Sequence, residues 1–172
     1  SKMYIVFNPE FLTERSANLD FINSSRIILS GHKSHTKKVK KLYRGRFPYK
    51  KIIETDSWES AEFIKYMCNC FFATKVSFMN EMYQISSHLG LNWQDVMSGF
   101  VSDGRIGNSH LDVPGHDGSL GFGGKCFPKD INAMINFSRD LGISPTILQS
   151  VWDKNLEVRE NKDWESIDGA TS

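Results

Sequence analysis

The sequence predicts an α/β unit, the edge of a parallel sheet, followed by a larger all-helical unit. Short apolar runs alternate with helix-like segments up to about residue 56, which is typical of parallel strands joined by helices. Residues 58–88 then contain neither proline nor glycine, which predicts one long helix. The chain has 172 residues, of which 40% are hydrophobic and 24% charged, so it can form a globular core.

The first unit is expected to contain short strands and helices in alternation. We expect strands at residues 3–7, 26–30 and 51–55, and helices at residues 12–23 and 34–44. Three short strands make a small sheet, so this unit is interpreted as the edge of something larger.

The second unit is expected to contain four helices, and local signals mark their ends. We expect them at residues 58–88, 92–101, 128–141 and 144–161. Gly90 and Gly142 occupy the positions where glycine ends a helix, and Ser144 followed by Pro145 is a typical helix start. The long loop 102–125 is a candidate functional segment. The polar stretch that ends the chain is expected to fray.

Charge and cysteine content exclude several classes of protein. A formal net charge of +1 argues against a dedicated nucleic-acid binder, although residues 33–51 hold nine Lys and Arg and no acid. That segment is interpreted as the solvated face of a helix that packs on the sheet, with an acidic-partner surface as the alternative. No apolar run is long enough to span a membrane, and no signal peptide is recognised. Three cysteines without a disulfide-like framework indicate a reducing cytoplasm.

The most informative stretch is GFGGKCFPKD at residues 121–130, in which a cysteine follows a glycine cluster. Pro128 is favoured in the first turn of a helix, so Cys126 is expected just before a helix N-terminus. The helix dipole and free N–H groups there favour an anionic thiolate. The glycines would let a bulky substrate approach the sulfur. The alternative interpretation is a glycine-rich turn with an incidental cysteine.

Two further pairs of residues are candidates for chemistry. Glu10 and Glu14 follow a strand end, where open parallel sheets place their sites, or they are acids that stabilise a helix dipole. Lys65 and Asn69 are four residues apart, so both lie on one face of the long helix. They could stabilise an oxyanion, or they could be an ordinary exposed pair.

Four segments together resemble the UDP-glucose/GDP-mannose dehydrogenase family. They are NPEFLTE at residues 8–14, Lys65-x-x-x-Asn69, RIGN at residues 105–108, and GFGGKCFPKD at residues 121–130. The resemblance implies that residues 1–56 are the C-terminal part of an NAD-binding Rossmann-like domain. It also implies that residues 57–161 are a central helical dimerisation and catalytic domain, a bundle like the C-terminal domain of 6-phosphogluconate dehydrogenase, and that residues 162–172 are a tail.

The resemblance implies NAD-dependent oxidation of the C6 alcohol of a nucleotide sugar, with a UDP-glucose-like sugar favoured, to a uronate. The chain would be a truncated core that lacks the N-terminal cofactor fingerprint and the C-terminal nucleotide domain. It would be a cytoplasmic homodimer that binds neither nucleic acid nor membrane and needs no metal. The alternative is an inactive helical dimerisation module or remnant of the family. A cysteine hydrolase is a weaker alternative, because no histidine is placed to suggest a Cys–His pair.

The resemblance also assigns roles to residues. Cys126 would form a thiohemiacetal and then a thioester, with Lys65, Asn69, Asp130 and Glu10 as the other catalytic residues. Glu14 and Lys129 would contact the cofactor. The substrate would be contacted by Arg105, Asn108, Gly121, Phe122, Gly123 and Phe127.

Overall fold

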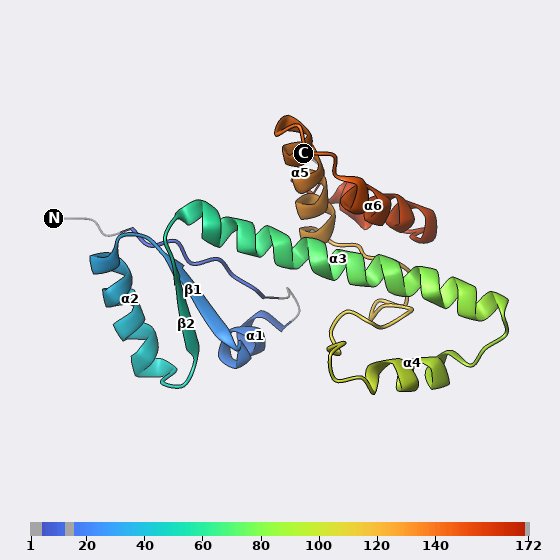
Figure 1. The fold of residues 1–172 in the computed structure, drawn as a ribbon, viewed down its shortest axis with the longest axis horizontal. Coiled ribbons are helices and arrows are strands. Elements are labelled where there is room, and N and C mark those ends of the chain that lie inside the picture. Colours follow the sequence, from blue (N-terminus) through green and yellow to red (C-terminus); the bar gives the residue numbers. More distant parts are fainter. Residues whose placement is uncertain (1–4, 13–15, 171–172) are drawn as a thin grey trace. The chain divides into compact units, whose positions relative to one another are not determined.

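The computed structural model describes residues 5–12 and 16–170, and its chain divides into two compact units, Ser1–Met67 and Cys68–Ser172 (Figure 1). The division falls inside the long helix α3 (Trp58–His88), which begins and ends at the residues that the sequence predicts. The boundaries of domains in the evolutionary sense stay a prediction. None of the helices in the described part of the chain combines the length and apolar character that crossing a membrane requires.

The first unit is built around two parallel strands. Strand β1 (Arg26–Ser30) pairs with β2 (Lys51–Thr55), and α2 (Lys33–Arg46) is the crossover between them. Four of the five residues of β1 are buried, because α2 packs against this strand. Both strands lie where the sequence predicts them, so the expected parallel α/β edge is present as a two-stranded sheet. The short helix α1 (Ala17–Asn23) precedes β1.

The strand expected at residues 3–7 is not present as such. Residues 3 and 4 lie outside the described residues, and of residues 5–7 only Phe7 pairs, in an isolated antiparallel bridge with Ser30. The pairing ends there because Asn8 uses its side chain to donate to the Ile28 carbonyl at 2.8 Å, and Pro9 has no N–H to donate.

The second unit contains the rest of α3 and three further helices. These are α4 (Trp93–Val101), α5 (Cys126–Asp140) and α6 (Thr146–Val158), followed by a 3-10 helix at Asp163–Ser166. Figure 1 shows α5 and α6 close together, and the loop 102–125 between α4 and α5 as a long irregular connection. Helices therefore form at all four expected places, with α5 starting two residues earlier than predicted and α6 ending three residues earlier.

Local hydrogen bonds explain why these helices end where they do. Gly90 has a φ of 67° and Gly142 a φ of 73°, the left-handed conformation that glycine tolerates best. After Gly90, the Leu91 N–H donates to the Ser86 carbonyl at 3.0 Å, which closes a Schellman motif. At the start of α4, the Asn92 side chain accepts from the N–H groups of Gln94 and Asp95.

Two hydrophobic clusters fix the loop 102–125 to the helices. One cluster joins α3, α5 and α6 around Ile131 and Ile135, and the loop contributes Phe122 to it. The other joins α3 and α4, and the loop contributes Leu111 and Val113. The loop is thus packed at both ends, which limits the positions available to the cysteine that follows it.

Residues 163–170 pack against the rest of the second unit, contrary to the expectation that the polar stretch frays. Trp164 is 2% exposed and Ala170 is fully buried. The ring of Trp164 lies 5.4 Å from the ring of Trp152 on α6, measured between centroids. One buried tryptophan removes enough apolar surface from water to order a short polar segment. The polar composition of the segment therefore gave the wrong expectation.

Candidate active site

Cys126 is the first residue of α5, and it is exposed. The sequence predicts Cys126 just before the helix, but α5 begins two residues earlier than predicted, so Cys126 lies in its first turn. The first N–H bonded within the helix is that of Lys129, which donates to the Lys125 carbonyl at 3.2 Å, and Pro128 has no N–H. The N–H groups of Cys126 and Phe127 therefore have no partner in the helix, as expected at an N-terminus that favours an anion.

Asp130 lies one helical turn after Cys126 and is 1% exposed. Its carboxylate accepts a hydrogen bond from the Asn69 amide of α3 at 2.5 Å and forms an ion pair with Lys129. A buried carboxylate is stable when it is paired and hydrogen-bonded in this way. The structure thus brings Asn69 of α3 to Lys129 and Asp130, which follow Cys126 in the first turns of α5.

The buried thiol of Cys70 is unsuited to nucleophilic chemistry. Cys70 is 6% exposed, and its sulfur lies 3.9 Å from the Asp130 carbonyl oxygen. Burial raises the pKa of Cys70 to about 12, and the negative charge of Asp130 adds to the effect. Cys70 therefore remains a thiol, and none of the three cysteines forms a disulfide. An exposed cysteine at a helix start is the better nucleophile.

In the first unit, Lys65 of α3 pairs with Glu10. The Lys65 ammonium forms an ion pair with the Glu10 carboxylate and donates to the Glu10 carbonyl at 3.0 Å. The Lys65 side chain is 21% exposed, so it is not the ordinary exposed residue of the alternative interpretation. Glu14, the predicted cofactor contact that follows, lies outside the described residues.

The predicted substrate residues Arg105 and Asn108 lie on the exposed part of the loop 102–125. The Arg105 side chain is 89% exposed and donates to both carboxylate oxygens of Asp103, at 2.9 and 3.2 Å from its Nε. These hydrogen bonds lower the pKa of Asp103. Asn108 is exposed. The role of both residues in substrate binding stays a prediction.

Phe127, the residue after the cysteine, packs among aromatic rings. Its ring centroid lies 5.6 Å from that of His110 and 5.9 Å from that of Phe122. His110 stacks on Phe72 at 4.2 Å, with a left-handed φ of 62°. Burial lowers the pKa of His110, and the nearby charge of Lys75 lowers it further, so the imidazole is neutral at neutral pH.

Of the three glycines before Cys126, Gly121 and Gly123 face the protein rather than open space. A Cβ at Gly121 would overlap the Asn155 amide oxygen, and one at Gly123 would overlap the Arg159 guanidinium and the Asp163 carboxylate. Phe122 between them is 5% exposed and belongs to the core. Only Gly124 has open space at its Cβ position. At Gly121 and Gly123 the missing side chain therefore makes room for neighbouring protein groups, and the predicted contact of these residues with substrate stays a prediction.

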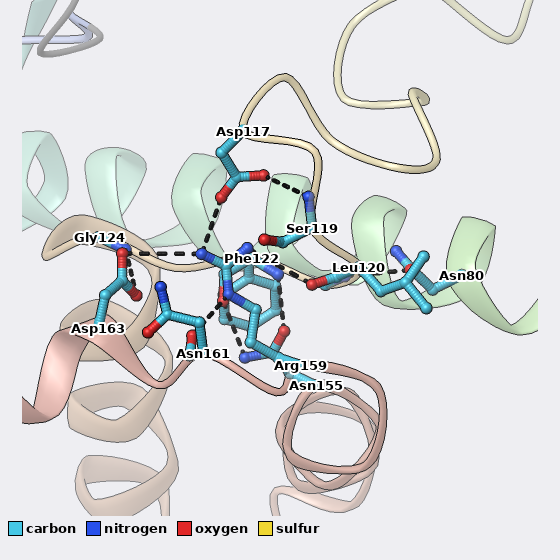
Figure 2. Close-up of polar contacts among 11 residues, drawn as sticks. Asn80, Asp117, Ser119, Leu120, Phe122, Gly124, Asn155, Arg159, Asn161 and Asp163 are labelled. Carbon is cyan, nitrogen blue, oxygen red and sulfur yellow. Dashed lines mark hydrogen bonds and ion pairs between the residues drawn. The ribbon is translucent and has the colours of Figure 1, made fainter.

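Asn155 of α6 and Asn80 of α3 hold this glycine segment by its backbone (Figure 2). The Asn155 side-chain oxygen accepts from the Phe122 N–H at 2.7 Å, and its amide donates to the Phe122 carbonyl at 3.0 Å. The Asn80 side chain accepts from the Gly121 N–H at 3.0 Å. Both asparagines are at most 1% exposed.

Arg159, just after α6, links the loop to the end of the chain (Figure 2). It is 3% exposed, and its Nη2 lies 2.8 Å from the Asp117 carboxylate and 3.7 Å from the Asp163 carboxylate. Burial alone would raise the pKa of Asp117, but the hydrogen bonds from Arg159 and from the Ser119 N–H, with the Arg159 charge, lower it overall. The Asp117 carboxylate is thus charged at neutral pH, which maintains the ion pair.

These holding residues were missed by sequence reasoning. Each is a polar residue whose partner lies far along the chain, since Asn155 is 33 residues from Phe122 and Asn80 is 41 residues from Gly121. The available signal was Trp164, an aromatic residue in a polar segment, which indicates that the segment packs against a core.

The sequence and the fold of this chain were compared with those of known proteins. The UDP-glucose/GDP-mannose dehydrogenase family, central domain, matches residues 59–157. UDP-glucose 6-dehydrogenase of Pseudomonas aeruginosa is 36% identical over 160 residues, which are 92% of this chain and 34% of the relative. UDP-glucose 6-dehydrogenase TuaD of Bacillus subtilis is 35% identical over 90% of this chain and 32% of the relative.

Solved structures give the same picture. A UDP-glucose dehydrogenase from the hyperthermophilic archaeon Pyrobaculum islandicum matches with a TM-score of 0.77 and 34% identity, over 88% of this chain and 34% of that one. A GDP-mannose dehydrogenase from Pseudomonas aeruginosa, solved as a ternary complex, matches with a TM-score of 0.53 and 29% identity, over 89% of this chain and 34% of that one. The chain spans about a third of the length of these relatives. Because the central-domain pattern covers more than half of its residues, the chain belongs to the UDP-glucose/GDP-mannose dehydrogenase family.

Proposed function

We propose that this chain is the nucleophile-bearing core of an NAD-dependent dehydrogenase that oxidises the C6 alcohol of a nucleotide sugar to a uronate. A UDP-glucose-like sugar is favoured, because the relatives named above are UDP-glucose 6-dehydrogenases. The observation that carries the proposal is the exposed Cys126 at the start of α5, with the buried Asp130 one turn away and hydrogen-bonded to Asn69.

The proposed role of Cys126 is covalent capture of the aldehyde formed at C6. The sulfur of the thiolate forms a bond to the aldehyde carbon, and the carbonyl electron pair moves to the oxygen, which gives a thiohemiacetal on protonation. Oxidation of that adduct gives a thioester, and water then replaces the sulfur to release the carboxylate. Capture on sulfur keeps the reactive aldehyde bound between the two oxidations.

The other polar residues are proposed to manage charge and protons. Lys65 and Asn69 stabilise negative charge on the sugar oxygen, because an ammonium and an amide are both donors to an oxyanion. Asp130 is proposed to take up and release protons during the reaction. Glu10, which forms an ion pair with Lys65, is proposed to assist hydrolysis of the thioester.

Among the described residues, no turn carries the G-x-G-x-x-G pattern of a dinucleotide-binding fold. The turn between β1 and α2 has a single glycine, Gly31, and a Cβ there would lie 3.0 Å from the Ile5 carbonyl oxygen. Lys129, proposed as a cofactor contact, is ion-paired to Asp130. NAD would accept the electrons of both oxidations when bound, and none of the residue roles above depends on where it binds.

The nucleophile is tested by grafting this chain in place of the matching third of the Pseudomonas aeruginosa relative. We expect NADH formation with a UDP-sugar, and Cys126→Ser should lower turnover roughly a thousand-fold or more, because a hydroxyl is a far weaker nucleophile than a thiolate. Cys68→Ser is the matched control and should retain turnover. NADH formation within ten-fold of the parent graft in Cys126→Ser would defeat the assignment. The isolated chain is assayed in parallel with a panel of UDP- and GDP-sugars.

A second candidate function is a helical dimerisation module, and exposed apolar side chains on α3 favour it. In the second unit, Phe71, Phe78 and Ile85 follow one another at seven-residue spacing and are 61%, 51% and 48% exposed. This spacing puts them on one face of the helix, as in helices that pair with a second helix. We propose that this face, the α3 apolar face, joins two copies of the chain.

Phe78→Glu is expected to weaken dimerisation at least roughly ten-fold, because it places a charge in the centre of the α3 apolar face. Sedimentation velocity over a range of concentrations measures the effect. Phe137→Glu is the matched control, since Phe137 is 50% exposed but lies on α5. A parent chain that stays monomeric at micromolar concentration would exclude this face as the dimer interface. A dimer that shows no response to NAD or to nucleotide sugars would favour the inactive-module alternative.

A further inference from the structure

The peptide bond between Gly123 and Gly124 has an unusual hydrogen-bond partner. The Gly124 N–H lies 3.1 and 3.2 Å from the two carboxylate oxygens of Asp163, which is 39 residues further along the chain. A peptide flanked by two glycines can adopt several orientations at little cost. The carboxylate of Asp163 selects one of them, two residues before Cys126.

Helix α5 has no cap of its own at the end that carries Cys126. The side chain of Lys125, the N-cap residue, makes no capping hydrogen bond, and the first turn contains no acidic residue. Helices normally use one or both devices to satisfy their first N–H groups and to complement the dipole. Asp163 brings a negative charge and a hydrogen-bond acceptor to the residue that precedes this N-cap.

Arg159 fixes the position of the Asp163 carboxylate. Its buried guanidinium lies between Asp163 and Asp117, and its Nε donates to the Asn161 carbonyl at 2.9 Å, which shapes the turn into the 3-10 helix (Figure 2). Arg159 and Asp163 both lie beyond the residues that match the family's central domain, 59–157.

We propose that Asp163, held by Arg159, is a positioning residue that fixes the Gly124 peptide at the entry to α5 and thereby fixes Cys126. The carboxylate touches neither the sulfur nor, in this proposal, the substrate. It acts through the Gly124 peptide, which determines how the chain enters α5. That Cys126 is a nucleophile rests on the proposed function, whereas the hydrogen bond from the Gly124 N–H to Asp163 does not.

Two variants distinguish the effect of the hydrogen-bond acceptor of Asp163 from the effect of its negative charge. Asp163→Ala removes both, and Asp163→Asn removes the charge but keeps an oxygen that can accept from the Gly124 N–H. In Asp163→Ala we expect amide hydrogen exchange at Gly124 to become at least roughly five-fold faster, because its N–H loses the acceptor that it has in the parent chain. Alkylation of Cys126 by iodoacetamide, followed by mass spectrometry at constant pH, should slow by a similar factor, because the frayed turn no longer directs its N–H groups at the thiolate.

Asp163→Asn should keep exchange and alkylation close to the parent values. Retention of both rates in Asp163→Asn distinguishes positioning by the hydrogen-bond acceptor from an effect of the charge, because loss of the charge alone would make the Asn and Ala variants alike. It also distinguishes positioning from a general loss of stability. Glu165→Ala is the matched control, because Glu165 is an exposed acid in the same 3-10 helix.

A second variant, Gly123→Ala, tests the same proposal if Asp163→Ala does not fold. A Cβ at Gly123 would displace Arg159 and Asp163, so Gly123→Ala should speed Gly124 exchange and slow Cys126 alkylation, whereas Gly104→Ala, in the same loop with open space, should do neither. The proposal is overturned if Asp163→Ala leaves either Gly124 exchange or Cys126 alkylation unchanged. The same holds for Gly123→Ala when that variant is used. It is also overturned if Asp163→Asn behaves like Asp163→Ala. Neither measurement requires NAD or a nucleotide sugar, so failure here is distinct from failure of the dehydrogenase assignment.

Discussion

Replacing Trp164 with alanine is expected to lower the free energy of unfolding by about 3–5 kcal/mol. The indole is 2% exposed and packs against Trp152, so its removal leaves a cavity beneath the 3-10 helix that carries Asp163. Urea unfolding followed by far-ultraviolet circular dichroism measures the change without relying on tryptophan fluorescence.

Ile147→Ala is the matched control for this prediction. Ile147 is a large apolar residue on α6 that is 71% exposed, and its truncation should change stability by no more than about 0.5 kcal/mol. If Trp164→Ala costs less than about 1 kcal/mol, the end of the chain does not pack as described.

Replacing Asn155 with alanine is expected to cost about 2–4 kcal/mol of stability. The Asn155 side chain is fully buried and bonds both the N–H and the carbonyl of Phe122. Alanine leaves a buried donor and a buried acceptor without partners, and the desolvation cost of each is no longer offset. The same urea titration measures this variant.

Asn136→Ala on α5 is the matched control for Asn155. Asn136 is an exposed asparagine whose one described side-chain contact is a 3.4 Å hydrogen bond from Arg139, and its loss should stay within about 0.5 kcal/mol. Equal effects of the two substitutions would show that the Phe122 backbone is not held by Asn155.

Local signals made the fold predictable from the sequence. The ends of α3 and α5 depend on Gly90 and Gly142, and the start of α4 depends on Asn92, so each is decided within a few residues. The parallel pairing of β1 and β2 followed from two short apolar runs separated by one helix. The family was recognisable because its motifs are contiguous.

The surroundings of Cys126 were predictable only in part. The motif marked the cysteine, and the resemblance marked Asn69 and Asp130, which the structure brings together. The packing at Gly121 and Gly123 was not predicted, because what a glycine avoids depends on residues that pack against it from α6 and beyond. Such contacts join positions more than thirty residues apart, and periodicity carries no information about them.

The burial of Ala170 determines how long a segment of this chain must be transferred if its cysteine turn is to be grafted into another protein. The family's pattern ends at residue 157, yet the side chains that brace the cysteine turn continue to Asp163, and the packing that anchors them continues to Ala170. A piece cut at the edge of the family's pattern would carry the sulfur without its brace. The smallest piece that keeps the braced cysteine turn therefore extends from within α3 to residue 170.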